Sequence, residues 1–288
     1  MQTMINIPPR RRLALPRGLC ARAIAALLAM LALAAAHAAE SYDDKYRLQR
    51  IKPHETALVL LHGKWGAAPA PLAAEFATER FHVVSPEMPW SGSRSYDATY
   101  EEGLKALNGI VATLRAGGYR RVLIGGQSFG ANGALAYAAV YGDVDGVMLF
   151  APGHNPDIDR NAQPRGMIAD ARAAIAANRP DQPVAFIDYN DGNRSKALQL
   201  RADVYVSFFA DDGLANMRLN ASRMSRPIPV LCVMGNGDFV TRQGSGYFFD
   251  RLPRHPKSQY LVSSAAHREV PRASFALALE WVNGLLNE

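Results

Sequence analysis

The sequence predicts an α/β fold with a doubly wound, mostly parallel sheet and helices on both of its faces. Two observations indicate this fold. Short runs rich in Val, Ile and Leu recur along the chain, and longer amphipathic stretches separate them. Apolar runs without alternation are typical of strands that are covered on both faces, and a helix between strands is the usual crossover of a parallel sheet. The roughly 250 residues beyond position 39 suffice for one domain with a sizeable core.

The first half of the sheet is expected from three apolar runs. Residues 56–63 (TALVLLHG) end at a glycine, and residues 81–89 (FHVVSPEMP) end in a proline-rich turn. Residues 121–125 (RVLIG) are the third run. Between them, residues 70–80 and 96–117 have apolar side chains at helical spacing, so each stretch predicts a crossover helix.

The second half repeats this pattern. An alanine-rich helix is expected at residues 129–141, and the apolar runs at 145–153 (DGVMLFAPG), 228–238 (IPVLCVMGNGD) and 258–267 (SQYLVSSAAH) predict three more strands. Residues 271–286 are amphipathic with a helical period and predict the closing helix. Reactive groups in such sheets collect beyond the carboxyl ends of the strands, so a site is expected there.

Residues 152–226 are longer than a crossover between two of these strands requires. They contain a helical stretch at 167–178, an expected extra strand at 183–187 and a further helical run that leads back to the sheet. We interpret them as a cap-like insertion over the strand ends that helps to form a pocket wall. The insertion is expected to belong to a single domain of residues 40–288.

The first 39 residues have the three parts of a secretory signal. Five arginines and no acidic residue precede the uncharged run at residues 23–36, and small residues follow in AHA at 36–38. We expect export to the periplasm or the medium, with cleavage after Ala38 or Ala39. An uncleaved anchor and a start at Met4 are the alternatives. The apolar run is shorter than the about 20 residues of a membrane span, so no stable span is expected after cleavage.

Charge and cysteine content narrow the classes of partner. The whole chain has 32 basic and 26 acidic residues, an excess of six. Because five basic residues belong to the expected signal, the mature chain has an excess of one, and its charge does not favour nucleic acid. Cys20 leaves with the signal, so Cys232 is not expected in an intramolecular disulfide. The sequence has no metal-ligand motif and no phosphate- or dinucleotide-binding glycine pattern, so neither metal nor cofactor is expected.

Ser128 stands between two glycines in GGQSFG, after a predicted strand and before a predicted helix. Such a tight turn forces unfavourable backbone angles on the residue at its tip and crowds its neighbours, which explains Gly126 and Gly130. The turn exposes the hydroxyl, and the amide of Phe129 points from the helix N-terminus at any oxyanion beside it. We therefore expect a nucleophile, with a glycine-rich turn of a binding protein as the alternative.

On these residues the chain resembles the α/β-hydrolase fold family, from about residue 57 to its end. That resemblance implies an acid and then a histidine after the serine, both at strand ends. Asp238 in GNGDFV and His267 in AAHREV take these places. His267 is therefore expected as the base and Asp238 as the carboxylate that orients it. Asp211 and Asp212 in FFADDG remain open as alternative acids.

The same resemblance implies that a His-Gly-x sequence after the first strand supplies part of an oxyanion hole. In LLHGKWG the residue after the glycine is Lys64, so the two donors are expected to be the backbone amides of Lys64 and Phe129. The side chain of Lys64 is expected to be solvated. Too few residues separate the expected cleavage site from residue 56 for the outer strands of many members, which implies a trimmed N-terminal sheet edge.

Four further residues near strand ends are candidates for a pocket, namely His62, Trp65, Trp90 and His154. Loop anchoring is the alternative for the two tryptophans, bracing of the loop for His62, and a polar surface position for His154.

The sequence thus predicts a serine hydrolase without a cofactor, acting on a small or medium carboxylic ester as its small-molecule partner. Thioesters, amides, lactones, transfer to an alcohol and cofactor-free peroxidation are open alternatives, because the same three side chains serve them. A hydrolase-like binding protein without turnover is the alternative from another class.

Overall fold

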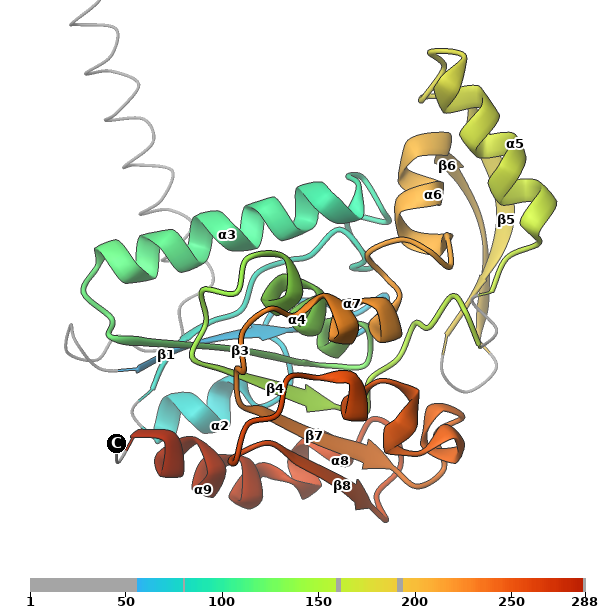
Figure 1. The fold of residues 1–288 in the computed structure, drawn as a ribbon. Helices are drawn as coiled ribbons and strands as arrows, with labels where there is room; N and C mark the ends of the chain where they lie inside the picture. The colour runs from blue at the N-terminus through green and yellow to red at the C-terminus, as the bar shows by residue number, and fades with distance from the viewer. Residues whose placement is uncertain (1–55, 80, 159–161, 191–193, 287–288) are drawn as a thin grey trace, which may run out of the picture. The chain divides into compact units, whose positions relative to one another are not determined.

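The computed structural model describes residues 56–79, 81–158, 162–190 and 194–286 (Figure 1). The expected signal, residues 1–39, lies outside the described residues. Among the helices that are described, none combines the length and the apolar character that a membrane crossing requires.

Six parallel strands form the central sheet, in the order β2-β1-β3-β4-β7-β8. Their bounds are β1 (Thr56–Leu61), β2 (His82–Val84), β3 (Arg121–Gln127), β4 (Gly146–Phe150), β7 (Val230–Gly235) and β8 (Gln259–Ser263). From β1 the chain steps to β2 at one edge, then crosses to β3 and proceeds strand by strand to β8 at the other. This confirms the predicted doubly wound α/β class, and in the described part of the chain β2 is the edge on the N-terminal side.

Helices cover both faces of this sheet (Figure 1). On one side lie α3 (Tyr100–Ala116), α4 (Phe129–Val140) and α7 (Met217–Arg223), and on the other α2 (Ala73–Thr78), α8 (Val270–Ala273) and α9 (Phe275–Leu286). α3 begins with a capping box, in which the Thr99 hydroxyl accepts from the Glu102 amide and the Glu102 carboxylate accepts from the Thr99 amide. The expected helices therefore form, and the closing one is divided into α8 and α9.

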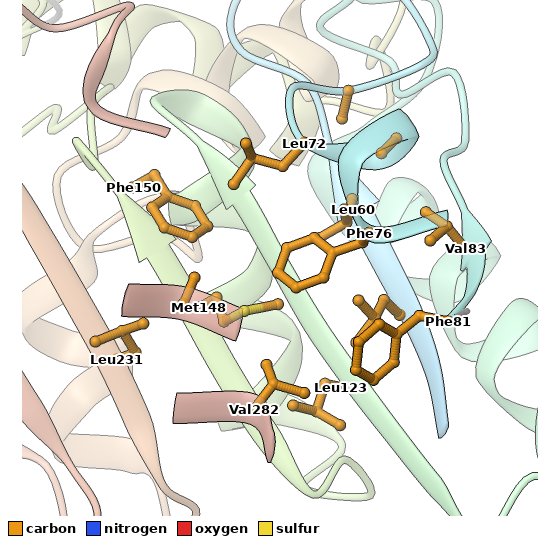
Figure 2. Close-up of a cluster of buried hydrophobic side chains, with 14 of the residues drawn as sticks. Leu60, Leu72, Phe76, Phe81, Val83, Leu123, Met148, Phe150, Leu231 and Val282 are labelled. Carbon is orange, nitrogen blue, oxygen red and sulfur yellow. The ribbon is translucent and has the colours of Figure 1, made fainter. Parts of the chain in front are cut away.

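An apolar core fills the space between the sheet and the pair α2 and α9 (Figure 2). Leu60, Leu123 and Met148 project from neighbouring strands toward Phe76 of α2 and Val282 of α9. The residues that alternate with them face α4 instead. Both sets are buried, which explains why the strands appear in the sequence as continuous apolar runs.

Between β4 and β7 lies the insertion, with α5 (Arg165–Ala176), β5 (Pro183–Tyr189), β6 (Ser195–Arg201), α6 (Ala202–Phe209) and α7. β5 and β6 form an antiparallel hairpin that is not part of the main sheet. Phe186 of β5 packs on Tyr205 and Phe209 of α6, with ring centroids 5.0 and 4.7 Å apart. The sequence did not predict β6, because its side chains are mostly exposed and form no apolar run.

Three short 3-10 helices connect β7 to β8, namely η1 (Val240–Gln243), η2 (Ser245–Tyr247) and η3 (Phe249–Arg251). The sequence did not predict them either, because single turns carry too few residues to show a helical period.

The turn between β3 and α4 crosses the end of β1 at very close range. A Cβ atom on Gly130 would lie 2.2 Å from the carbonyl oxygen of Leu61, and one on Gly126 would lie 2.5 Å from the carbonyl carbon of Gly130. No residue with a side chain fits these two positions unless the backbone moves. The two glycines thus allow three backbone segments to meet at Ser128.

We expect Gly130→Ala to lower the free energy of unfolding by about 3 kcal/mol, because the new methyl group has to displace backbone atoms. Urea denaturation measures this change. Gly109→Ala in α3 is the control, since a Cβ there meets nothing within 4 Å; it should raise the free energy of unfolding by about 0.5–1 kcal/mol. Equal stability of Gly130→Ala and the wild type would contradict the crowding.

Candidate active site

Ser128 occupies the turn between β3 and α4, with φ 57° and ψ −118°. A residue with a side chain rarely adopts a positive φ, so this conformation is strained and persists only where neighbouring groups hold it. Its amide donates to the Phe150 carbonyl at 2.9 Å, and its carbonyl accepts from the amides of Ala131 and Gly153 at 3.1 Å. The end of β4, the loop after it and the first turn of α4 thus hold the serine in place.

Two glycines leave room for the Ser128 side chain, and the residue is only 8% exposed. A Cβ on Gly153 would lie 2.9 Å from Ser128 Oγ, and one on Gly63 would lie 3.3 Å from Ser128 Cβ. Phe129 is the first residue of α4, where backbone amides lack intrahelical partners and the helix dipole is positive. The hydroxyl therefore lies beside donors that suit a developing negative charge.

His267 and Asp238 come from the turns that follow the neighbouring strands β8 and β7. His267 Nδ1 lies 2.8 Å from Asp238 Oδ1, and the two side chains are 17% and 12% exposed. Because a carboxylate accepts, Nδ1 carries the proton and Nε2 is the basic atom of the ring. A Cβ atom on Gly153 would lie 2.9 Å from Ser128 Oγ and 3.8 Å from His267 Cε1, so the hydroxyl and the ring border the same space beside Gly153.

Asp211 and Asp212 lie in the insertion. Asp212 forms an ion pair with Arg172 of α5, and its side chain is 59% exposed. Asp238, in contrast, accepts from the Gly235 amide at 3.3 Å through the oxygen that does not contact the histidine. The carboxylate that the structure brings to His267 is therefore that of Asp238.

His62 holds two backbone groups around the loop after β1, residues 62–66, which we call the β1 loop. Its Nε2 accepts from the Met88 amide at 3.0 Å. Since an amide only donates, the ring proton is on Nδ1, which faces the Gly63 carbonyl at 2.9 Å. Burial lowers the pKa of His62 below its usual value, so the ring is neutral. The histidine thus links the β1 loop to the segment after β2.

The side chain of Lys64 is buried, contrary to the expectation that it is solvated. Its ammonium group lies 2.8 Å from Asp188 Oδ1, and the two side chains are 3% and 0% exposed. A buried charge requires a partner, and here the partner comes from β5, 124 residues further along the chain. A local pattern in the sequence carries no signal of such a pair.

The four candidate pocket residues differ in exposure: Trp65 is half-buried, whereas His62, Trp90 and His154 are buried. Trp90 has no exposed surface; it stacks on Phe129 at 4.7 Å and donates to the His62 carbonyl at 2.9 Å. His154 also stacks on Phe129, at 3.8 Å, and its Nε2 lies 2.8 Å from the Phe208 carbonyl. Trp90 therefore anchors the loop and His154 is not a polar surface residue, which leaves Trp65 as the candidate that reaches the surface.

Three residues near the site were not predicted from the sequence, namely Asp188, Gly153 and Asn190, whose side-chain amide donates to the Lys64 carbonyl at 2.9 Å. Asp188 follows Phe186 by two residues and lies on the same buried face of β5, and a charged residue at an inward position of a strand is a signal that could have revealed it. Gly153 carries no such signal, because its contact with Ser128 depends on the path of the loop after β4. In the described part of the chain, no three His, Cys, Asp or Glu side chains gather as a metal site requires.

Comparisons with known proteins agree on one fold. The model of the alpha/beta hydrolase family matches residues 58–281, and no curated protein matches the chain. One similar structure belongs to a study of two metagenome-derived lipolytic enzymes, LipS and LipT; it has a TM-score of 0.57 and 17% identity, over 84% of this chain and 98% of that one. A monoacylglycerol lipase from Paleococcus ferrophilus has a TM-score of 0.57 and 19% identity, over 82% and 98%. The alpha/beta hydrolase GrgF from Penicillium sp. sh18 has a TM-score of 0.59 and 14% identity, over 82% and 90%.

The lowered pKa of His62 predicts how stability depends on pH. Below about pH 6.5 the unfolded chain binds a proton at this ring, whereas the folded chain resists it. The stabilisation is therefore fully present above that pH and is lost as the pH falls through the lower folded-state pKa. His62→Gln keeps an acceptor for the Met88 amide but does not titrate, so its free energy of unfolding should decline less between about pH 7 and pH 5. Parallel wild-type and variant curves from urea denaturation would refute this.

Proposed function

The chain belongs to the alpha/beta hydrolase family, and from that premise we propose that it is a serine hydrolase that cleaves a small or medium carboxylic ester. The observation that carries the proposal is the 2.8 Å contact between His267 Nδ1 and Asp238 Oδ1, at the sheet edge where Ser128 has φ 57°. A serine hydroxyl is nearly un-ionised at neutral pH and needs such a base to become a nucleophile.

In the proposed first half of the reaction, Ser128 Oγ attacks the carbonyl carbon of the ester while His267 Nε2 takes the hydroxyl proton. The carbonyl oxygen becomes an oxyanion, which the backbone amides of Lys64 and Phe129 bind. When this intermediate collapses, the bond to the alcohol oxygen breaks and His267 gives its proton to the leaving alcohol. Ser128 is left carrying the acyl group as an ester.

Water completes the reaction in the second half. His267 takes a proton from water as the water oxygen adds to the acyl carbon, and the same two amides bind the new oxyanion. The bond to Ser128 Oγ then breaks, and His267 returns the proton to the serine. Asp238 keeps the ring in the tautomer with the proton on Nδ1 and stabilises the imidazolium in both halves, without taking a proton itself.

Two observations support a small or medium ester as the first substrate class to test. Two of the similar structures are lipolytic by name, and lipolysis is ester hydrolysis. Ser128 is 8% exposed, so little of its surface is open to a bulky substrate. Thioesters, amides and lactones belong in the same assay, because the proposed chemistry serves them equally. A binding role without turnover gives no physical reason to keep a base and a carboxylate beside the serine.

Ser128→Ala should abolish ester turnover and leave folding nearly unchanged, because only the nucleophilic oxygen is lost. A fluorophosphonate probe, with the adduct located by peptide mass, should label Ser128 in the wild type and nothing in the variant. Wild-type turnover in Ser128→Ala would refute the assignment. A folded wild type that forms no adduct would favour the binding protein.

Asp238→Asn should lower kcat by a factor on the order of 10⁴, because an amide at this place favours the wrong tautomer of His267. Asp212→Asn is the matched control: it changes an exposed carboxylate of the insertion that pairs with Arg172, and its kcat should stay near the wild-type value. If Asp212→Asn loses far more activity than Asp238→Asn, the acid is assigned wrongly.

A further inference from the structure

Three consecutive residues at the end of β5 and just beyond it contact Lys64. Asp188 Oδ1 accepts from the Lys64 ammonium group at 2.8 Å, and the Tyr189 carbonyl accepts from the same group at 2.9 Å. The side-chain amide of Asn190 donates to the backbone carbonyl of Lys64, also at 2.9 Å. The hairpin therefore holds Lys64 both at the end of its side chain and at its main chain.

The second carboxylate oxygen of Asp188 binds two aromatic residues. It accepts from Trp65 Nε1 at 3.2 Å and from the Tyr96 hydroxyl at 2.7 Å. Trp65 and Tyr96 have φ values of 55° and 63°, so both are strained and depend on contacts that hold them. Burial and the neighbouring Asp188 charge raise the pKa of Tyr96 well above its usual value, so the hydroxyl keeps the proton that it donates.

The ion pair at the centre of this cluster is closed to water and lies near the residue that follows Ser128. The side chains of Lys64 and Asp188 are 3% and 0% exposed. The Lys64 ammonium group lies 5.8 Å from the ring centres of Phe129, the residue after Ser128, and of Phe209 in α6. In such surroundings a charge that loses its partner stays buried and unpaired, which is strongly unfavourable. The pair therefore has one stable arrangement.

We propose that Asp188 and Asn190 are positioning residues, which hold the main chain of Lys64 in the orientation where its amide binds the oxyanion. The inference rests on the proposed function and deepens it. Neither residue touches the substrate; both act through Lys64. The β5–β6 hairpin is then part of the acyl-transfer site.

A positioning role has a kinetic signature that a purely structural role lacks. Charge on the substrate oxygen is greatest in the transition state, so a displaced donor weakens transition-state binding more than ester binding. Loss of the positioning contacts should therefore lower kcat and leave KM nearly unchanged. A residue that only stabilised the fold would reduce the fraction of active protein, with kcat per active site unchanged.

The first variant is Asn190→Asp, which removes the donor to the Lys64 carbonyl at a half-buried position with almost no change of shape. Asn178→Asp is the matched control, because it adds the same charge to the same insertion at an exposed position after α5. Asp188→Asn is the second variant, and Asn190→Asp decides the question where Asp188→Asn fails to fold. We would measure kcat and KM per active site, titrated with the fluorophosphonate, and hydrogen exchange of the β1 loop amides by peptide mass.

Asn190→Asp should show faster amide exchange in the β1 loop and a kcat lower by about 10²-fold, with KM nearly unchanged. Asp188→Asn should lose at least as much, and Asn178→Asp should match the wild type in every measurement. An unchanged kcat in Asn190→Asp, or a lower kcat with unchanged exchange in the loop, would overturn the inference. A wild type without ester turnover or a Ser128 adduct would instead refute the proposed function, and the exchange would still decide whether the hairpin holds the loop.

Discussion

The site depends on one close contact, where the turn after β3 crosses the end of β1. A Cβ at position 130 would lie 2.2 Å from the Leu61 carbonyl oxygen, and Ser128 at the tip of the turn has φ 57°. A strained residue keeps such angles only if its neighbours cannot relax independently. Here the amide of the serine donates to β4, and its carbonyl accepts from the loop after β4 and from α4. The position of the hydroxyl therefore depends on β1, β3, β4 and α4 together.

The β1 loop begins at the end of β1, next to this contact. Neutral hydrogen bonds hold it on one side and a buried ion pair holds it on the other. On one side His62 and Trp90 hold it with neutral hydrogen bonds. On the other side the insertion contacts it through the buried pair of Lys64 and Asp188. The desolvation of a buried ion pair offsets most of its attraction, so such a pair adds little net stability. Its main physical effect here is orientation, because Asp188 accepts from the Lys64 ammonium group through Oδ1 while Trp65 and Tyr96 hold its Oδ2.

Most of the fold follows from apolar patterning. The strands β1, β2, β3, β4 and β7 are buried on both faces, so their runs of Val, Ile and Leu are visible without any tertiary information, whereas β8 at the edge is only partly buried. The strand β6 was not predicted, because its side chains are mostly exposed and form no such run. The order of serine, acid and histidine placed Ser128, Asp238 and His267 at strand ends, and the parallel sheet brings those ends to one edge. Trp90 is a core residue with no exposed surface, although its place after a strand end is equally typical of a pocket wall.

The sequence by itself determined the parallel sheet, the glycines around Ser128 and the choice of residues that can act there, because burial and tight turns constrain residue types locally. Only the tertiary structure decided which partner each of two carboxylates meets. Asp238 meets His267 because β7 and β8 are neighbours, and Asp188 meets Lys64 across 124 residues because the hairpin folds back onto the β1 loop. A charge is compatible with water or with any opposite charge, so its partner is set by packing and leaves no local pattern.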